Sequence, residues 1–206
     1  NIMKAESPGP SVSRLVPKVR TTAKILYSIY IGMTIIQVVL LVLGKMSLFD
    51  ALTLTFGTAG TGGFGIRNDS VGSFSSYHQI VTTIFMILFG INFNAYYFIL
   101  LGKAKAAFKI EEVRGYLAII GVATLAIAVN IYHMYGSLAE TLRHAAFQVA
   151  SIITTTGYTT TDFNQWPEVS RTKLVILMFI GACAGSTGGG IKVSRILILL
   201  KTVKKE

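Results

Sequence analysis

Long apolar runs without charges constrain this sequence of 206 residues more than any other feature. Four runs are long enough to cross a bilayer, which takes about 20 apolar residues at a rise of about 1.5 Å each. They are Ile25 to Leu43, Gln79 to Gly102, Gly115 to Gly136, and Leu174 to Ile191, whose apolar character continues to Leu200. Because backbone groups in lipid must be satisfied within the segment, we expect four helices of an all-α integral membrane protein.

The distribution of basic residues predicts which helix ends face the cytoplasm. Lys and Arg outnumber Asp and Glu by 19 to 9, but the excess does not gather on one polar face as it does in nucleic-acid-binding proteins. It precedes the first span, separates the second from the third, and follows the fourth. The residues are Lys18, Arg20, Lys24, Lys103, Lys105, Lys109, Arg114, Lys201, Lys204 and Lys205. By the positive-inside rule these connections are cytoplasmic, so residues 45–78 and 137–173 face outside.

The two outer connections have the same unusual composition. Each opens with an apolar stretch too short to span, at residues 46–56 and 137–153, and then becomes rich in glycine and threonine. We interpret each as a half-helix followed by an extended loop. The two halves of the chain also align without a gap at an offset of 94 residues, with Leu48 on Leu142 and Gly63 on Gly157. This unit is too long for a solenoid repeat and favours symmetry about a pore axis.

The alignment predicts two tandem pore units, each made of helix, half-helix, loop and helix. The predicted segments are a cytoplasmic lead-in at 1–22, a first unit at 23–110 with its loop at 58–65 and an interrupted helix at 79–102, and a second unit at 111–206 with its loop at 154–162 and its last helix at 172–201. Both units begin on the cytoplasmic side, which disfavours the inverted repeats of many secondary transporters.

The glycine and threonine residues of the two loops suggest an ion filter. Non-helical backbone at membrane depth needs partners for its carbonyl groups, and a permeating cation can be that partner. Gly157 can take the positive φ that turns successive carbonyls toward one axis, and the threonines add hydroxyl oxygens without net charge. We expect Tyr158 and Phe64 to wedge the loops against the helices, and Asp162 to attract cations at the outer mouth. The predicted ion-binding residues are Thr61, Gly62, Gly63, Thr155, Thr156 and Gly157.

Five segments of the chain resemble the Trk/Ktr/HKT superfamily of potassium and sodium transporters, and within it the membrane subunits of bacterial Trk systems. They are residues 5–10, 46–52, 58–65, 154–163 and 185–195. Members of this family carry four such units around one pore, with one glycine from each loop in the filter. The resemblance therefore implies that Gly63 and Gly157 are filter glycines of the third and fourth units. It also implies that an N-terminal half with the first two units completes the pore.

The same resemblance implies a gate below the filter, formed by an irregular loop in the second helix of the third unit and a cation from the last helix. The matching residues are Gly90, Asn92 and Asn94, with Lys192 or Arg195 as the cation. Gly90 would permit the bend. A plainer interpretation stays open, because glycine is common in membrane helices and asparagine bonds to neighbouring helices. Lys192 and Arg195 would then extend from the last helix to the inner interface.

Two segments look like phosphate-binding loops but do not support an enzyme. The G-x-G-x-x-G pattern at 60–65 has no strand–helix–strand unit around it, and Ile191 interrupts the Walker-like segment 185–194. We expect potassium uptake, with K+ as the transported ion and no organic cofactor. The alternatives are a sodium-permeable or ion-coupled transporter of the same family, and a structural membrane subunit without a conducting pore. The resemblance further implies a homodimer in the bacterial inner membrane and a cytosolic nucleotide-binding subunit of the TrkA or KtrA kind.

Overall fold

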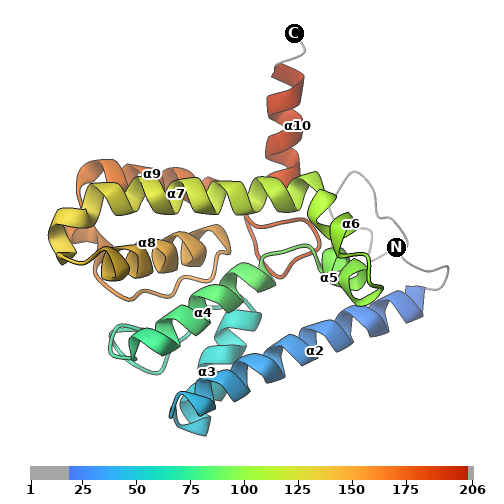
Figure 1. Cartoon of the computed structure of the whole chain (residues 1–206), viewed down its shortest axis with the longest axis horizontal. Coiled ribbons are helices and arrows are strands. Elements are labelled where there is room, and N and C mark those ends of the chain that lie inside the picture. The colour runs from blue at the N-terminus through green and yellow to red at the C-terminus, as the bar shows by residue number, and fades with distance from the viewer. Residues whose placement is uncertain (1–18, 204–206) are drawn as a thin grey trace.

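A computed structural model describes residues 19–203, and their regular structure is helical (Figure 1). The elements are α2 (Val19–Leu43), α3 (Leu48–Ala59), α4 (Ser76–Phe89), α5 (Phe93–Leu100), α6 (Ala104–Lys109), α7 (Glu111–Tyr135), α8 (Leu138–Ile153), the short 3-10 helix η1 (Phe163–Gln165), α9 (Glu168–Phe179) and α10 (Val193–Val203). Nearly all of the predicted lead-in lies outside the described residues, and α2 begins at Val19 rather than after residue 22.

The two half-helices are present as α3 and α8, with 12 and 16 residues. Both are shorter than the roughly 20 residues that a bilayer requires. The Ser47 hydroxyl caps α3 by accepting a hydrogen bond from the N–H of Asp50 at 3.1 Å, which satisfies one of the free donors at the helix start. Each half-helix ends in a loop that returns toward the side from which the helix came (Figure 1). Short helices therefore occur at both places where the sequence predicts half-helices.

Among residues 19–203, two helices are long and apolar enough to cross a membrane, Thr22–Leu43 of α2 and the whole of α7. A third span exists if α4 and α5 count as one, although these two helices meet at an angle of 93°. The break between them, at residues 90–92, lies inside the predicted interrupted helix 79–102.

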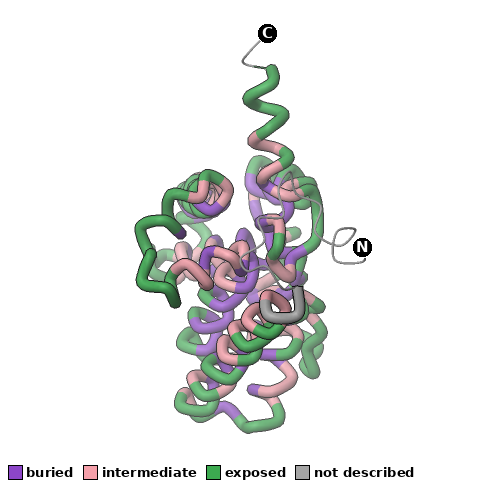
Figure 2. Tube along the Cα trace, turned by 90° about the vertical axis from the view of Figure 1, so that its right-hand side faces the viewer, coloured by how far each residue is buried: buried purple, intermediate pink, exposed green. Residues whose placement is uncertain are grey.

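The prediction of one continuous last helix over 172–201 is wrong. Helix α9 ends at Phe179 and α10 starts at Val193, and residues 180–192 form a loop that we call the inner loop. Gly185 and Gly190 in this loop have φ values of 71° and 73°, which a helix does not contain and which glycine adopts without steric cost. Helix α10 then projects away from α7 and α9, and most of its length is exposed (Figures 1 and 2). The prediction failed because the segment is apolar on average, although it contains several glycines that interrupt a helix.

Two large apolar cores and a small third cluster at Ala95, Ala107 and Val113 hold the described helices together, and the first core draws on both units. It contains Leu41, Leu54 and Phe89 from the first unit together with Phe147 and Tyr158 from the second. The second core lies among α7, α8, α9 and the inner loop. Buried residues gather in the middle of the molecule and exposed residues lie around its outside (Figure 2). Large apolar residues of α2 and α7 are among the exposed ones, for example Ile35 and Val129. An apolar exposed face is what a lipid-facing helix requires.

Candidate pore loops and inner loop

The loops after α3 and α8 fold back onto their own half-helices by the same backbone hydrogen bonds. In the first loop, the N–H groups of Gly62 and Gly63 donate to the carbonyl of Gly57 at 2.9 and 3.2 Å. In the second loop the corresponding pairs are Thr156 to Ser151 at 2.9 Å and Gly157 to Ser151 at 3.3 Å. Each residue of the second set lies 94 positions after its counterpart, the offset found in the sequence. The duplication therefore extends to individual hydrogen bonds.

The backbone angles of the two loops repeat as well. Thr61 and Thr155 have φ values of 51° and 59°, and Gly63 and Gly157 have values of 65° and 90°. A threonine at positive φ is unusual because its branched side chain crowds the backbone. Such strained residues persist only where the surroundings enforce them, and they cluster at functional sites. Two strained threonines at equivalent positions mark both loops as functional candidates.

The predicted filter glycines have different surroundings. A Cβ atom at Gly63 would overlap the carbonyl oxygen of Thr156, so the two loops are in direct contact at this point. At Gly157, by contrast, a Cβ atom would meet no heavy atom within 4 Å, and the residue is exposed. Gly62 is exposed too. The two loops therefore touch at Gly63, whereas Gly157 has open space beside it.

The threonine hydroxyls of the loops bond to protein groups in this structure. The Thr156 hydroxyl shares a hydrogen bond of 2.7 Å with that of Thr154, and the Thr155 hydroxyl donates to the carbonyl of Thr154 at 2.6 Å. The Thr61 hydroxyl donates to the carbonyl of Thr187 at 3.1 Å. These hydroxyls hold the loops in shape, so the backbone carbonyls are the better candidates for contact with an ion.

Tyr158 anchors its loop as the sequence predicts, but Phe64 does not. Tyr158 is fully buried, and its hydroxyl lies 3.2 Å from the carbonyl of Leu54 and 3.3 Å from that of Phe64. Gly57 makes room for this hydroxyl, because a Cβ atom there would overlap it. The Phe64 side chain is 81% exposed. Within the described residues Phe64 therefore does not wedge its loop, and Tyr158 from the other unit occupies the space beside α3.

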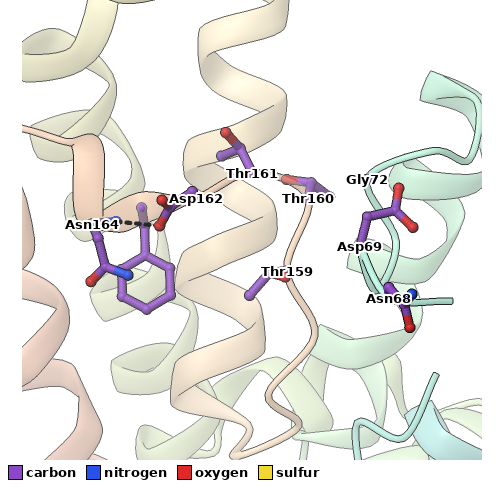
Figure 3. Close-up of a pocket in the computed structure, with 9 residues that line it drawn as sticks. Asn68, Asp69, Gly72, Thr159, Thr160, Thr161, Asp162 and Asn164 are labelled. Atoms are coloured by element: carbon purple, nitrogen blue, oxygen red, sulfur yellow. Dashed lines mark hydrogen bonds between the residues drawn. The ribbon is translucent and has the colours of Figure 1, made fainter.

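An outer cavity of about 520 Å³ lies between residues 68–72 of the first unit and residues 159–164 of the second (Figure 3). Asp162 and Asn164 lie on one side of it, and Asn68 and Asp69 lie on the other (Figure 3). The Asp162 carboxylate accepts hydrogen bonds from the N–H of Asn164 at 3.0 Å and from the Gln165 amide at 3.3 Å. The bond from Asn164 is the main reason why the pKa of Asp162 is lower than its usual value. Asp162 thus adds a stable negative charge to the cavity.

A polar side chain of each half-helix ties it to its return loop. In the first unit Asp50 pairs with Arg67 at 3.4 Å. His144, which lies 94 positions after Asp50, has its Nδ1 atom 2.8 Å from the Thr160 hydroxyl. The His144 ring also stacks on Tyr135 with 4.9 Å between ring centroids. The sequence did not predict these contacts. Asp50 and His144 occupy equivalent positions in the repeat, but one forms an ion pair and the other a hydrogen bond to a hydroxyl group.

The break between α4 and α5 is filled by the inner loop. The N–H of Cys183 donates to the Gly90 carbonyl at 3.0 Å, and the N–H of Thr187 donates to the Phe89 carbonyl at 3.3 Å. Asn92 caps α5 by accepting the N–H of Asn94 at 2.9 Å. These contacts supply the partners that backbone groups freed by a break in the membrane require.

The prediction that Gly90 permits the bend between α4 and α5 is wrong. Its φ is −78°, an ordinary helical value, so no glycine is needed for the bend. Instead, a Cβ atom at this position would overlap the Tyr116 hydroxyl and lie 3.0 Å from the Thr154 side chain. Gly90 therefore allows α4 to approach α7 and the end of α8 closely.

The middle of the inner loop contacts both pore loops. The carbonyl of Thr187 accepts the hydrogen bond from the Thr61 hydroxyl, and the N–H of Gly189 donates to the Thr155 hydroxyl at 2.8 Å. The Lys192 side chain is partly buried and donates to the carbonyl of Gly188, within this same loop. Arg195 is exposed on α10. The structure thus brings Lys192, but not the Arg195 side chain, into the loop that touches the two strained threonines.

Spanning helices, paired half-helices and return loops in contact with each other define a helical integral membrane protein with re-entrant segments. The sequence profile of the TrkH family, described as "Cation transport protein", matches residues 4–127 and 116–206. The chain therefore belongs to the TrkH family of cation transport proteins.

Curated relatives and a solved structure agree with this assignment. The Trk system potassium uptake protein TrkH of Salmonella typhimurium is 36% identical over all of this chain and 44% of its own length. Its namesake from Vibrio parahaemolyticus is 37% identical over 96% of this chain and 42% of its own length. The crystal structure of the potassium transporter TrkH from Vibrio parahaemolyticus superimposes with a TM-score of 0.85 at 35% identity, over 93% of this chain and 43% of that one. The chain thus spans less than half the length of these relatives.

Proposed function

We propose that this chain contributes the third and fourth units of a potassium uptake pore, with the ion path between the loops at 58–65 and 154–162. The observation that carries the proposal is the pair of loops with equivalent hydrogen bonds and with left-handed residues at equivalent positions. The names of the relatives support potassium as the ion. The chain accounts for two of the four loops that such a pore needs, so an N-terminal half supplies the others.

Backbone geometry gives the proposed filter its chemistry. In extended backbone successive carbonyls point to opposite sides, whereas left-handed residues two positions apart turn several of them to one side. Carbonyl oxygens directed at one axis can replace the water shell of a potassium ion without binding it too tightly to leave. Asp162 and Asp69, beside the outer cavity, raise the local cation concentration before the ion enters.

The proposed gate lies below the filter, where the inner loop fills the break between α4 and α5. The hydrogen bonds of the inner loop with Thr61 and Thr155 support this proposal. The ammonium group of Lys192 would oppose cations in this position until the loop moves. Movement of the inner loop, rather than of residues 90–94 alone, is therefore the opening step in this proposal.

The remaining partners follow from the family and from surfaces on the chain. Phe64 and Phe56 are large apolar residues beside the pore loops, and both are exposed in the described part of the chain. We propose that the first two units cover them and close the ring. A homodimer and a cytosolic nucleotide-binding subunit of the TrkA or KtrA kind complete the proposed assembly, and any nucleotide belongs to that subunit.

Substitution of Gly157 by serine tests the filter. Gly157 has open space but a φ of 90°, so the variant changes the pore surface and also strains the backbone. Gly136→Ser is the matched control, because Gly136 also has a positive φ of 63° and open space, but lies at the turn between α7 and α8. The measurement is rubidium flux into liposomes that carry the whole polypeptide, with sodium as competitor.

We expect Gly157→Ser to lower the preference for potassium over sodium while Gly136→Ser leaves it unchanged. If both variants lower the preference for potassium equally, backbone strain explains the effect and the assignment of Gly157 to the filter is contradicted. Sodium flux as strong as rubidium flux before substitution would favour the sodium-permeable alternative. No flux from folded protein supplied with its cytosolic subunit would favour a structural subunit.

A further inference from the structure

A single carboxylate holds both ends of the inner loop. One oxygen of Glu112, Oε1, accepts hydrogen bonds from the N–H of Ala184 at 2.7 Å and from the N–H of Ser194 at 3.2 Å. Ala184 lies near the start of the loop, and Ser194 lies two residues after its end. Glu112 itself is in the first turn of α7, a helix long enough to span the membrane. The loop is therefore fastened to a fixed helix through one side chain.

The chemistry of this contact makes it stronger than an ordinary backbone hydrogen bond. A carboxylate that accepts from N–H groups forms charge-assisted bonds, which are roughly twice as strong as neutral ones. Ser194 is the second residue of α10, so the negative charge also lies at the positive end of a helix dipole. Glu112 is partly buried, which reduces screening by water.

The residues between these two bonds, together with Cys183 directly before the first of them, are those that contact the pore loops and the break after α4. Cys183 and Thr187 bond to carbonyls at the break after α4, and Thr187 and Gly189 bond to the two strained threonines of the filter loops. Release of the loop at Glu112 would free its ends and loosen all of these contacts together. A loop without this fastening has only weaker neutral bonds to keep it under the filter.

We propose that Glu112 is the positioning residue that latches the inner loop beneath the pore loops, and that opening of the pore requires this latch to break. The role of this latch in transport rests on the proposed function. The latch itself can be tested by the mobility of the inner loop, without measuring ion flux.

The chain contains its own reporter for this movement. Cys183, its only cysteine, is fully buried in the inner loop. The rate at which N-ethylmaleimide modifies it, followed by mass spectrometry of the peptide that contains Cys183, measures how often the loop opens. The whole polypeptide in liposomes is the sample. Glu111→Gln is the matched control, because the neighbouring Glu111 pairs with Lys201 on an exposed surface.

We expect Glu112→Gln to increase the modification rate of Cys183 about tenfold, because an amide oxygen keeps the acceptor but loses the charge. Glu111→Gln should change it less than twofold. Glu112→Asp, which keeps the charge on a shorter side chain, should give a rate between those of the wild type and Glu112→Gln. Rubidium flux should rise in Glu112→Gln with its preference over sodium unchanged, since the filter loops are not altered.

An unchanged modification rate in folded Glu112→Gln would overturn the latch, even if rubidium flux were normal and selective. A raised rate in that variant, with no rubidium flux from any variant, would support the latch and contradict the proposed function instead. If Glu112→Gln does not fold, the comparison of Glu112→Asp with Glu111→Asp gives the same test, and equal rates in those two would overturn the proposal.

Discussion

The contact between Gly57 and Tyr158 yields a quantitative prediction. The Tyr158 hydroxyl occupies the space that a Cβ atom at position 57 would need. Gly57→Ala places a Cβ atom against the Tyr158 hydroxyl, and overpacking of this kind costs about 1–3 kcal/mol of stability. Alanine in place of a helical glycine returns about 1 kcal/mol. The net cost of this substitution is therefore about 1 kcal/mol, with an upper limit of about 2 kcal/mol.

Tyr158→Phe removes one hydroxyl donor and costs about 1 kcal/mol. The Leu54 carbonyl that loses this donor still accepts from the Thr58 hydroxyl at 2.8 Å, and the Phe64 carbonyl loses a contact of 3.3 Å. In the double variant the overlapping oxygen is gone, and the nearest remaining ring atom lies 3.1 Å from the new Cβ atom. The alanine then keeps its helical advantage. We expect the double variant to be more stable than the sum of the single variants by about 1–2 kcal/mol.

The assay is unfolding of the whole polypeptide in mixed micelles by titration with sodium dodecyl sulfate, which gives a free energy for each variant. Gly121→Ala is the control for helix propensity, because Gly121 lies in α7 and a Cβ atom there meets no other atom within 4 Å. Single-variant costs that add to within about 0.5 kcal/mol in the double variant would refute the proposed fit.

Two predictions concern charged residues on the proposed ion path. Asp162→Asn should lower rubidium flux about twofold at low salt; because the pKa of Asp162 is lowered, its carboxylate stays charged and the reduction should be equal at pH 5 and pH 8. A reduction that disappears at pH 5 would contradict this assignment. Lys192→Gln should increase rubidium flux severalfold, whereas Arg195→Gln, on the exposed side of α10, should leave it unchanged. Equal increases in the two variants would show that Lys192 has no special position.

The sequence was sufficient to predict the features that depend on pattern and spacing. Long neutral runs predicted α2 and α7, and short apolar stretches before glycine-rich segments predicted α3 and α8. The alignment of Gly63 with Gly157 anticipated equivalent positive φ values, because a duplicated segment keeps its backbone requirements. The family and the absence of an enzymatic role also followed from the motifs and agree with the comparisons.

Features that depend on three-dimensional contacts were not accessible in the same way. The apolar residues on both sides of 180–192 suggested one continuous helix. No sequence pattern shows that the carbonyls at the break between α4 and α5 accept hydrogen bonds from this loop. Nothing in the sequence separates Glu112 from Glu111, which are adjacent and chemically identical. Only the fold reveals that Glu112 accepts two backbone hydrogen bonds while Glu111 pairs at the surface.

The burial of Tyr158 in the first core also determines the order of assembly during synthesis. Its hydroxyl bonds to Leu54, which is made 104 residues earlier. At about 5–20 residues per second, the ribosome needs roughly 5–20 s to reach this tyrosine after the first half-helix has emerged. During that interval the groove at Gly57 is unfilled and the first unit has an incomplete core. Completion of the first unit's core therefore waits until the second unit has been made.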